Sequence, residues 1–159
     1  ARMLRAQLAD CGVRVTIDAI PRWDLFAEGP EGPLSGRRFD MALATWWLED
    51  RPPCDRYLSS EVPEADNWAG GNVSGYVNPD YDLVCRSALQ ALPGSAGYGR
   101  HHREAQVIFS NDLPALPLFM TLRTGLARPR VQGLVMDTTS PSELWNVERM
   151  RIVDPASGS

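Results

Sequence analysis

Two indole rings and two carboxylates lie close together in the sequence, at Trp46, Trp47, Glu49 and Asp50. Aromatic side chains provide flat apolar walls, and a carboxylate beside them can pair with a positive charge. Residues of these types in this order suit a ligand that has an apolar body and a cationic group. A free peptide, with its amino terminus, is one such ligand, so these four residues are the candidate binding residues.

The apolar run before these residues predicts the element that positions them. Residues 41–46 have the length and the boundaries of a buried strand, although a segment of a core helix has a similar pattern. Pro52 and Pro53 prevent either element from continuing. The candidate residues should therefore lie where a buried element emerges into a loop, which is where ligand sites form in open α/β sheets.

The strand interpretation separates the two indoles. Adjacent residues of a strand face opposite sides, so one indole should pack in the core and the other should line a cleft. Ala42 and Ala44 share the face of Trp46 and leave room beside it, which favours Trp46 as the ligand contact. The alternative for Glu49 and Asp50 is that they are ordinary solvated carboxylates, because burying a carboxylate without a partner is costly.

Length and composition narrow the class of protein. The chain has 159 residues, of which 43% are hydrophobic and 23% charged, and this is typical of one soluble globular domain. The net charge of −4 argues against a nucleic-acid partner. The chain shows no secretion signal and begins at Ala1 within a helical pattern. We therefore expect it to be a piece of a longer protein.

Other kinds of chemistry find no support in the sequence. The nucleophile motif GxSxG is absent, and no cysteine has a catalytic partner placed by a motif. His101 and His102 are adjacent, so their side chains would diverge by about 100° on a helix, and no metal site is expected. Cys11, Cys54 and Cys85 form no CxxC pair, which leaves open one disulfide of undetermined pairing or three free thiols. We expect no enzyme activity and no cofactor.

Apolar periodicity predicts alternating helices and strands in the first part of the chain. Residues 2–10 should form an amphipathic helix that ends at Gly12. Residues 13–20 alternate between apolar and polar side chains, as in a half-buried strand. A short helix should follow Pro21, before the strand at 40–46. This order favours parallel pairing of the two strands across a crossover helix.

The second part should contain two longer helices followed by strands. Asn78 and Pro79 are typical of a helix start, and this helix should break at Pro93. In the loop before it, Tyr76 should anchor the chain to the core. The other expected features are an irregular loop at 59–78, a helix at 98–112, an extended stretch at 115–122, a strand region at 145–153 and a disordered tail at 154–159.

Five segments form a recognisable ordered set: LRAQLADCGVRVTI (4–17), RFDMALATWW (38–47), VSGYVNPDYDLV (73–84), REAQVIFSNDLPALPLF (103–119) and VQGL (131–134). The combination of GYxNPxYD with the downstream EAQxIxxxDLPxxPL is the most specific part. The set resembles the carboxyl-terminal third of the family-5 extracellular solute-binding proteins, which are the peptide and oligopeptide receptors of ABC importers. The resemblance runs from residue 1 to about residue 150.

This resemblance implies a fold and a site. The fold class would be α/β, a periplasmic-binding-protein-like lobe with a mixed β-sheet flanked by helices, and a fragment of a two-lobed clamshell. Residues 1–153 would form the carboxyl-terminal lobe, followed by the tail at 154–159. In the family the loop after the tryptophan-containing strand lines the peptide cleft. An acidic residue in that loop pairs with the peptide amino group, and the matching position is Glu49, with Asp50 beside it.

The resemblance also implies partners and a location. The ligand would be a peptide or another small solute, and the protein partners would be a missing amino-terminal lobe and an ABC transporter permease. The location would be extracellular or periplasmic, with a membrane anchor on the full-length protein. An exposed surface meant for the missing lobe would favour dimerisation. The open alternatives are a ligand-sensing domain of a larger regulator and a non-transport interaction domain of the same fold.

Overall fold

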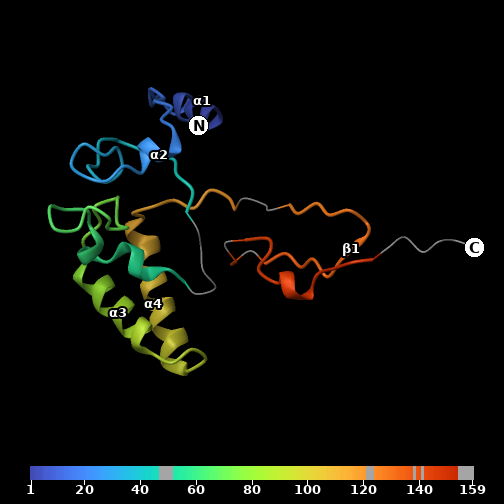
Figure 1. Ribbon diagram of the computed structural model, residues 1–159. Coiled ribbons are helices and arrows are strands. Elements are labelled where there is room, and N and C mark those ends of the chain that lie inside the picture. Colours follow the sequence, from blue (N-terminus) through green and yellow to red (C-terminus); the bar gives the residue numbers. More distant parts are fainter. Residues whose placement is uncertain (47–51, 121–123, 138, 141, 154–159) are drawn as a thin grey trace, which may run out of the picture. The chain divides into compact units, whose positions relative to one another are not determined.

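The computed structural model describes residues 1–46, 52–120, 124–137, 139–140 and 142–153 (Figure 1). The described residues divide into two compact units. The first unit covers residues 1–46 and 52–116, and the second begins at residue 117. The predicted tail at 154–159 lies outside the described residues.

Helices make up most of the regular structure of the first unit. These are α1 (Arg2–Asp10), α2 (Arg22–Leu25), α3 (Pro79–Gln90) and α4 (Ala96–Asp112), with the short 3-10 turns η1 (Cys54–Tyr57) and η2 (Ser59–Glu61). All four helices were predicted from the sequence. Gly12, with a φ of 81°, follows α1 in the left-handed conformation that was predicted to end it.

Local hydrogen bonds account for the position of α3 and α4. The Asn78 side chain accepts hydrogen bonds from the backbone N–H groups of Asp80 and Tyr81, and Pro79 occupies the first helical position. The Ser95 hydroxyl oxygen caps α4 by accepting from the backbone N–H of Tyr98 at 3.1 Å. The two helices pack side by side, joined by a short connection (Figure 1).

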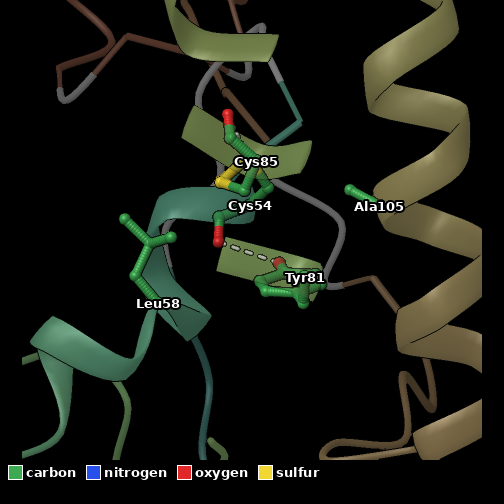
Figure 2. Packing of buried hydrophobic residues seen from close by; sticks show 5 residues of the cluster. All are labelled: Cys54, Leu58, Tyr81, Cys85 and Ala105. Atoms are coloured by element: carbon green, nitrogen blue, oxygen red, sulfur yellow. Dashed lines mark hydrogen bonds between the residues drawn. A yellow bond between two sulfur atoms is a disulfide. The ribbon is translucent and has the colours of Figure 1, made fainter. Parts of the chain in front are cut away.

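The core of the first unit lies between η1, α3 and α4 (Figure 2). Its buried members are Cys54, Leu58, Tyr81, Cys85 and Ala105. The structure also settles the cysteine pairing. Cys54 and Cys85 form a disulfide with Cα atoms 5.7 Å apart, whereas Cys11 is free and exposed.

The second unit contains a small antiparallel sheet. Strand β1 (Val131–Gln132) pairs with β2 (Arg151–Ile152), and the turn η3 (Val147–Arg149) precedes β2. The buried Asn146 donates from Nδ2 to the Gly133 carbonyl oxygen at 2.9 Å, which ties the two halves of this unit together. The strand region predicted at 145–153 is therefore confirmed only for its last part.

Two predicted strands are wrong. Residues 13–20 and 40–46 form no strand within the described part of the chain. The predicted burial is also wrong, because Met41 is 60% and Leu43 48% exposed. An apolar run becomes a strand only when a neighbouring strand pairs with it, and the pairing described here is the antiparallel one of β1 with β2.

The predicted fold class is thus supported at a coarse level. The described chain mixes helices with strands, as an α/β protein does, but its described sheet has only two strands. The parallel pairing expected across α2 does not occur among the described residues. The clamshell arrangement and the lobe boundary at residue 153 stay predictions.

Candidate functional site

Trp46 is held by an aromatic ring on one side and a cation on another. The Phe26 ring meets it edge-on, with centroids 5.3 Å apart and an interplanar angle of 88°. The Arg56 guanidinium carbon lies 4.7 Å from the centroid of the Trp46 ring, within range of a cation–π contact. Trp46 is half-buried in this arrangement. The indole is therefore fixed in place although its backbone belongs to no strand.

Trp46 lines a hollow of about 210 Å³ in the first unit. The side chains around this hollow come from five separate segments of the chain. They include Phe26, Leu34, Trp46, Arg56, Trp68 and Val73. The lining thus combines aromatic and aliphatic side chains with the Arg56 guanidinium, and Glu28 and Ser35 add polar groups. Such a mixture is typical of small-molecule sites.

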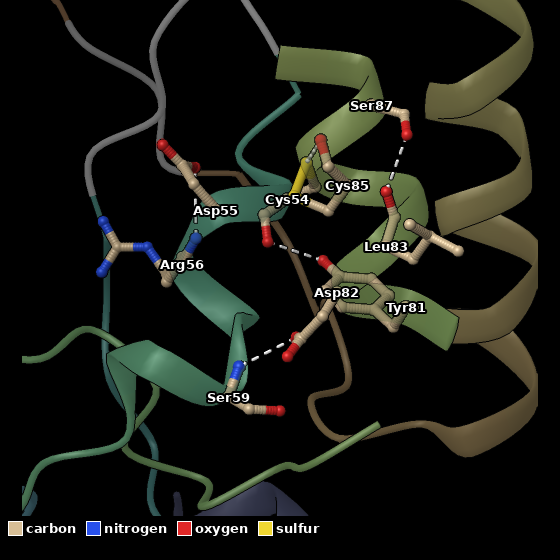
Figure 3. The surroundings of a disulfide bond; sticks show 9 residues. All are labelled: Cys54, Asp55, Arg56, Ser59, Tyr81, Asp82, Leu83, Cys85 and Ser87. Carbon is tan, nitrogen blue, oxygen red and sulfur yellow. Dashed lines mark hydrogen bonds between the residues drawn. A yellow bond between two sulfur atoms is a disulfide. The ribbon is translucent and has the colours of Figure 1, made fainter. Parts of the chain in front are cut away.

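Arg56 is positioned by the anchoring of η1 to α3 (Figure 3). The Cys54–Cys85 disulfide joins the two elements, and the Tyr81 hydroxyl donates to the Cys54 carbonyl oxygen at 2.8 Å. Beyond η1, the backbone N–H of Ser59 donates to the Asp82 carboxylate at 2.9 Å. Figure 3 shows the Arg56 side chain pointing away from these contacts. The turn is therefore fixed at both ends while its arginine faces the hollow.

A buried asparagine organises the loop on another side of the hollow. Asn72 is completely buried, and its Nδ2 donates to the carbonyl oxygens of Tyr57, Leu58 and Tyr76. Its Oδ1 accepts from the Ser74 hydroxyl and from the Tyr76 backbone N–H. Both polar atoms of this side chain are used in tying the loop to itself and to η1, so Asn72 is not free to bind a ligand.

The backbone comes very close to itself at the edge of the hollow. A Cβ atom added to Gly70 would lie 2.3 Å from the Glu61 carbonyl oxygen. A Cβ atom on Gly71 would lie 3.3 Å from Cγ of Arg56. Glycine at position 70 is thus required by packing, and glycine at position 71 leaves space beside the arginine.

Tyr76 anchors the loop to the core, as predicted. Its ring contacts the Tyr81 ring with centroids 5.4 Å apart, and its hydroxyl donates to the Asp112 carboxylate at 2.6 Å. The Asn78 Nδ2 donates to the same carboxylate at 2.7 Å. These two hydrogen bonds, chiefly the one from Tyr76, hold the pKa of Asp112 below its ordinary value. Burial, supported by Asp112, raises the pKa of Tyr76 far above its usual range.

The structure places only one of the four candidate binding residues. Trp46 lines the hollow, whereas Trp47, Glu49 and Asp50 lie outside the described residues. The sequence analysis did not identify Arg56, because it belongs to no motif and only the fold of η1 brings it over Trp46. The sequence analysis also did not identify Trp68, which lines the hollow. The available signal was its position just before the adjacent glycines Gly70 and Gly71.

The described residues show neither a metal-ligating cluster nor a membrane-spanning helix. Within the described ranges, no group of three or more metal-ligating side chains comes together. His101 instead faces Glu104, with Nδ1 3.2 Å from a carboxylate oxygen. Of the helices that the structure describes, none has the length and apolar character to cross a membrane.

The chain is similar in sequence to peptide-binding periplasmic proteins. It is 29% identical to the peptide transport periplasmic protein SapA of Salmonella typhimurium over 149 residues, covering 94% of this chain and 26% of that protein. It is 27% identical to the di/tripeptide-binding protein 4 of Pseudomonas aeruginosa over 140 residues, covering 88% of this chain and 25% of that protein. An uncharacterized lipoprotein of Mycobacterium tuberculosis is 26% identical over 121 residues, covering 76% of this chain and 21% of that protein.

These relatives confirm the resemblance that the sequence motifs indicated. The chain spans about a quarter of the length of the relatives it matches most fully. No protein-family model matches the chain, and no solved structure matches it.

Proposed function

From this likeness we propose that the chain is part of the solute receptor of an ABC importer and helps to capture peptides or similar small solutes. The observation that carries the proposal is the similarity to peptide-binding periplasmic proteins along 88–94% of the chain. Residues 1–153 would belong to the carboxyl-terminal lobe of a protein about four times as long, since the chain spans about a quarter of each of these relatives.

The proposed mechanism is capture, without a chemical step. A ligand would bind between two lobes, and closure would be stabilised by contacts that exist only in the closed state. Trp46 and Trp47 would supply the apolar wall of the cleft. Glu49 or Asp50 would pair with the ligand amino group, a charge-assisted contact worth about 1.5–3 kcal/mol in a partly desolvated site.

The hollow around Trp46 supports the placement of this wall. It combines indole surface, aliphatic surface and charged groups, and its member Trp46 precedes the two acids by three and four positions in the sequence. The Phe26 and Arg56 contacts fix the Trp46 ring before any ligand arrives. Such preorganisation lowers the entropic cost of binding.

We further propose an extracellular or periplasmic location, with a membrane anchor on the full-length protein. The Cys54–Cys85 disulfide fits an oxidising compartment. One relative is a peptide transport periplasmic protein, another is a di/tripeptide-binding protein, and a third is a lipoprotein. Fractionation of the native host should recover the protein outside the cytoplasm, and recovery in the cytoplasm would contradict this location.

The exposed apolar side chains suit contact with the rest of the receptor. Leu116, Phe119 and Met120 are exposed by 64%, 71% and 84%. In the proposed receptor the amino-terminal lobe and the segments joining the lobes would cover such side chains. Ultracentrifugation should therefore find the 159-residue chain self-associating and the complete receptor monomeric, and a monomeric chain at high concentration would oppose this assignment.

The function is tested by calorimetry on two proteins: the 159-residue chain and the product of the complete reading frame that encodes it. Dialanine and trialanine should bind the complete product, and bind the 159-residue chain weakly or not at all, because the facing lobe is absent. Micromolar binding by the 159-residue chain would contradict the two-lobe mechanism. Absence of binding to any member of a di- and tripeptide panel by the complete product would contradict the function.

Variants of the complete product locate the site. Trp46→Ala should weaken dialanine binding, whereas Trp23→Ala should not, because Trp23 is 77% exposed and does not line the hollow. Glu49→Gln and Asp50→Asn should reduce the preference for a free amino terminus over an acetylated one. Equal effects of the two tryptophan variants would remove Trp46 from the proposed site.

A further inference from the structure

Arg56 has hydrogen-bonding groups that the described part of the chain leaves unused. Its Nε atom is buried and has no hydrogen-bond partner. Its side-chain nitrogens donate no hydrogen bond to any described residue, and no described carboxylate lies within salt-bridge distance. A guanidinium carries five N–H donors, and burying the Nε donor without a partner is costly.

The contacts of Arg56 orient its side chain, but none of those described pairs its positive charge with a carboxylate. The Trp46 ring packs against the guanidinium, and the Cys54–Cys85 disulfide holds the turn from which Arg56 projects. Because Nε is covered, the terminal nitrogens Nη1 and Nη2 carry the accessible donors. Gly71 presents no side chain toward this group, since even a Cβ atom there would lie only 3.7 Å from Nη1.

The hollow beside Arg56 has a size and a lining that suit one end of a small organic anion. Its volume of about 210 Å³ is far more than one water molecule requires. Its walls mix apolar side chains with polar groups that include the exposed Glu28 carboxylate, and the apolar part strengthens the attraction between a guanidinium and a bound carboxylate. A planar carboxylate matches the fork of terminal guanidinium nitrogens through two parallel hydrogen bonds.

We propose that Arg56, stacked on Trp46 in this hollow, binds a carboxylate group of the ligand. For a peptide ligand, the proposal rests on the proposed function and adds a carboxylate to the amino group as a second recognised group. For the hollow by itself, the proposal is that Arg56 binds carboxylates in general. The two carboxylates that a peptide can offer are its terminal one and that of an acidic side chain.

The hollow itself is tested with acetate, using the ¹⁵N-labelled 159-residue chain. The Nε–Hε resonance of Arg56 is assigned by its loss in Arg56→Lys, and sodium acetate is titrated against acetamide and against sodium chloride at equal ionic strength. Acetate should shift this resonance with saturation, and acetamide and chloride should not. Equal shifts with acetate and chloride would show ionic screening only and would overturn the proposal.

Control variants separate recognition from folding. Arg86→Gln removes another arginine of the first unit, one that is exposed and does not line the hollow, and the acetate response should persist. Glu49→Gln/Asp50→Asn tests whether Arg56 only serves as a partner for these acids. An acetate response that is kept or strengthened in this double variant supports ligand binding, and its loss overturns the proposal.

A second experiment tests the proposal in the complete receptor. It compares the affinities of dialanine, dialanine amide and Ala-Glu amide for the product of the complete reading frame. Dialanine should bind roughly 10- to 100-fold more tightly than its amide, the range expected for a hydrogen-bonded charged group. Arg56→Lys should reduce this ratio, and Arg56→Gln should bring it near one. Recovery of affinity with Ala-Glu amide would identify a side-chain carboxylate as the recognised group.

The outcomes distinguish the two proposals. If peptides bind but the acid and amide forms bind equally and acetate leaves Arg56 unchanged, the carboxylate site is wrong and the peptide receptor stands. If no peptide binds but acetate still shifts the Arg56 resonance specifically, the proposed receptor function is wrong and the carboxylate site stands.

Discussion

Reduction of the Cys54–Cys85 disulfide tests how the candidate site is held in place. The bond joins residues 31 positions apart and therefore closes a loop of about that length in the unfolded chain. The chain-entropy relation assigns about 3.7 kcal/mol of stability to a loop of this size. That is a large share of the 5–15 kcal/mol or so that separates folded from unfolded domains, so the effect should be easy to measure.

The assay is urea unfolding followed by circular dichroism of the helices, with and without a reductant. A Cys11→Ser background removes the exposed free thiol and leaves only the bonded pair. A loss of about 3.7 kcal/mol should lower the urea midpoint by roughly 1–4 M for the urea m-values of about 1–3 kcal/mol/M that small proteins show. A Cys54→Ala/Cys85→Ala variant should show no response to the reductant.

The disulfide also positions Arg56, so reduction of the bond should change the geometry of the hollow. Freed from α3, η1 should hold the guanidinium less firmly over Trp46, and the acetate response of Arg56 should weaken after reduction. A stability change below about 1 kcal/mol would refute the loop-closure reasoning. An unchanged acetate response in a folded, reduced chain would refute the claim that the disulfide positions the arginine.

Other predictions concern the loop and the helix ends. Asn72→Ala should destabilise the first unit by roughly 1–3 kcal/mol in urea unfolding, because carbonyl oxygens in the loop lose their donor; a neutral result would mean that water replaces it. The lowered pKa of Asp112 contributes stability above its ordinary value of 3.8, and this contribution is lost as the pH falls through the lowered pKa. The Asp112→Asn variant should therefore lose less free energy of unfolding than the wild type between pH 7 and pH 2, as measured by urea unfolding. Equal losses would show that Asp112 does not contribute to the acid dependence of stability. Gly70→Ala should destabilise by about 1–3 kcal/mol, because its Cβ atom would overlap the Glu61 carbonyl oxygen. Gly97→Ala, in an open position of α4, should instead gain up to about 1 kcal/mol in thermal unfolding, and the same sign for both glycines would contradict the packing argument.

Helices could be predicted from the sequence because their determinants are local. The start of α3 depends on Asn78 and Pro79, which lie beside the backbone groups that they serve. The end of α1 depends on a glycine that can adopt a positive φ. Hydrogen bonds within a helix join residues four positions apart, so a short window contains the whole interaction.

Strands could not be predicted in the same way. The alternation at 13–20 and the apolar run at 40–46 are compatible with strands, but a strand requires a partner that may be far away in the sequence. The described structure pairs neither segment. Trp46 nevertheless lines the hollow, so its identification depended on residue type and not on the strand that was expected to present it.

What the sequence by itself determined is the set of helices, the start of α3 at Asn78, the end of α1 at Gly12 and the resemblance to peptide receptors. Only the tertiary structure decided that Cys54 pairs with Cys85, that Asn72 is consumed by its own loop, and that Arg56 stacks on Trp46. Each of these contacts joins segments that are separated in the sequence or depends on how a loop closes. Such contacts arise from the burial of surfaces that no local window of residues contains.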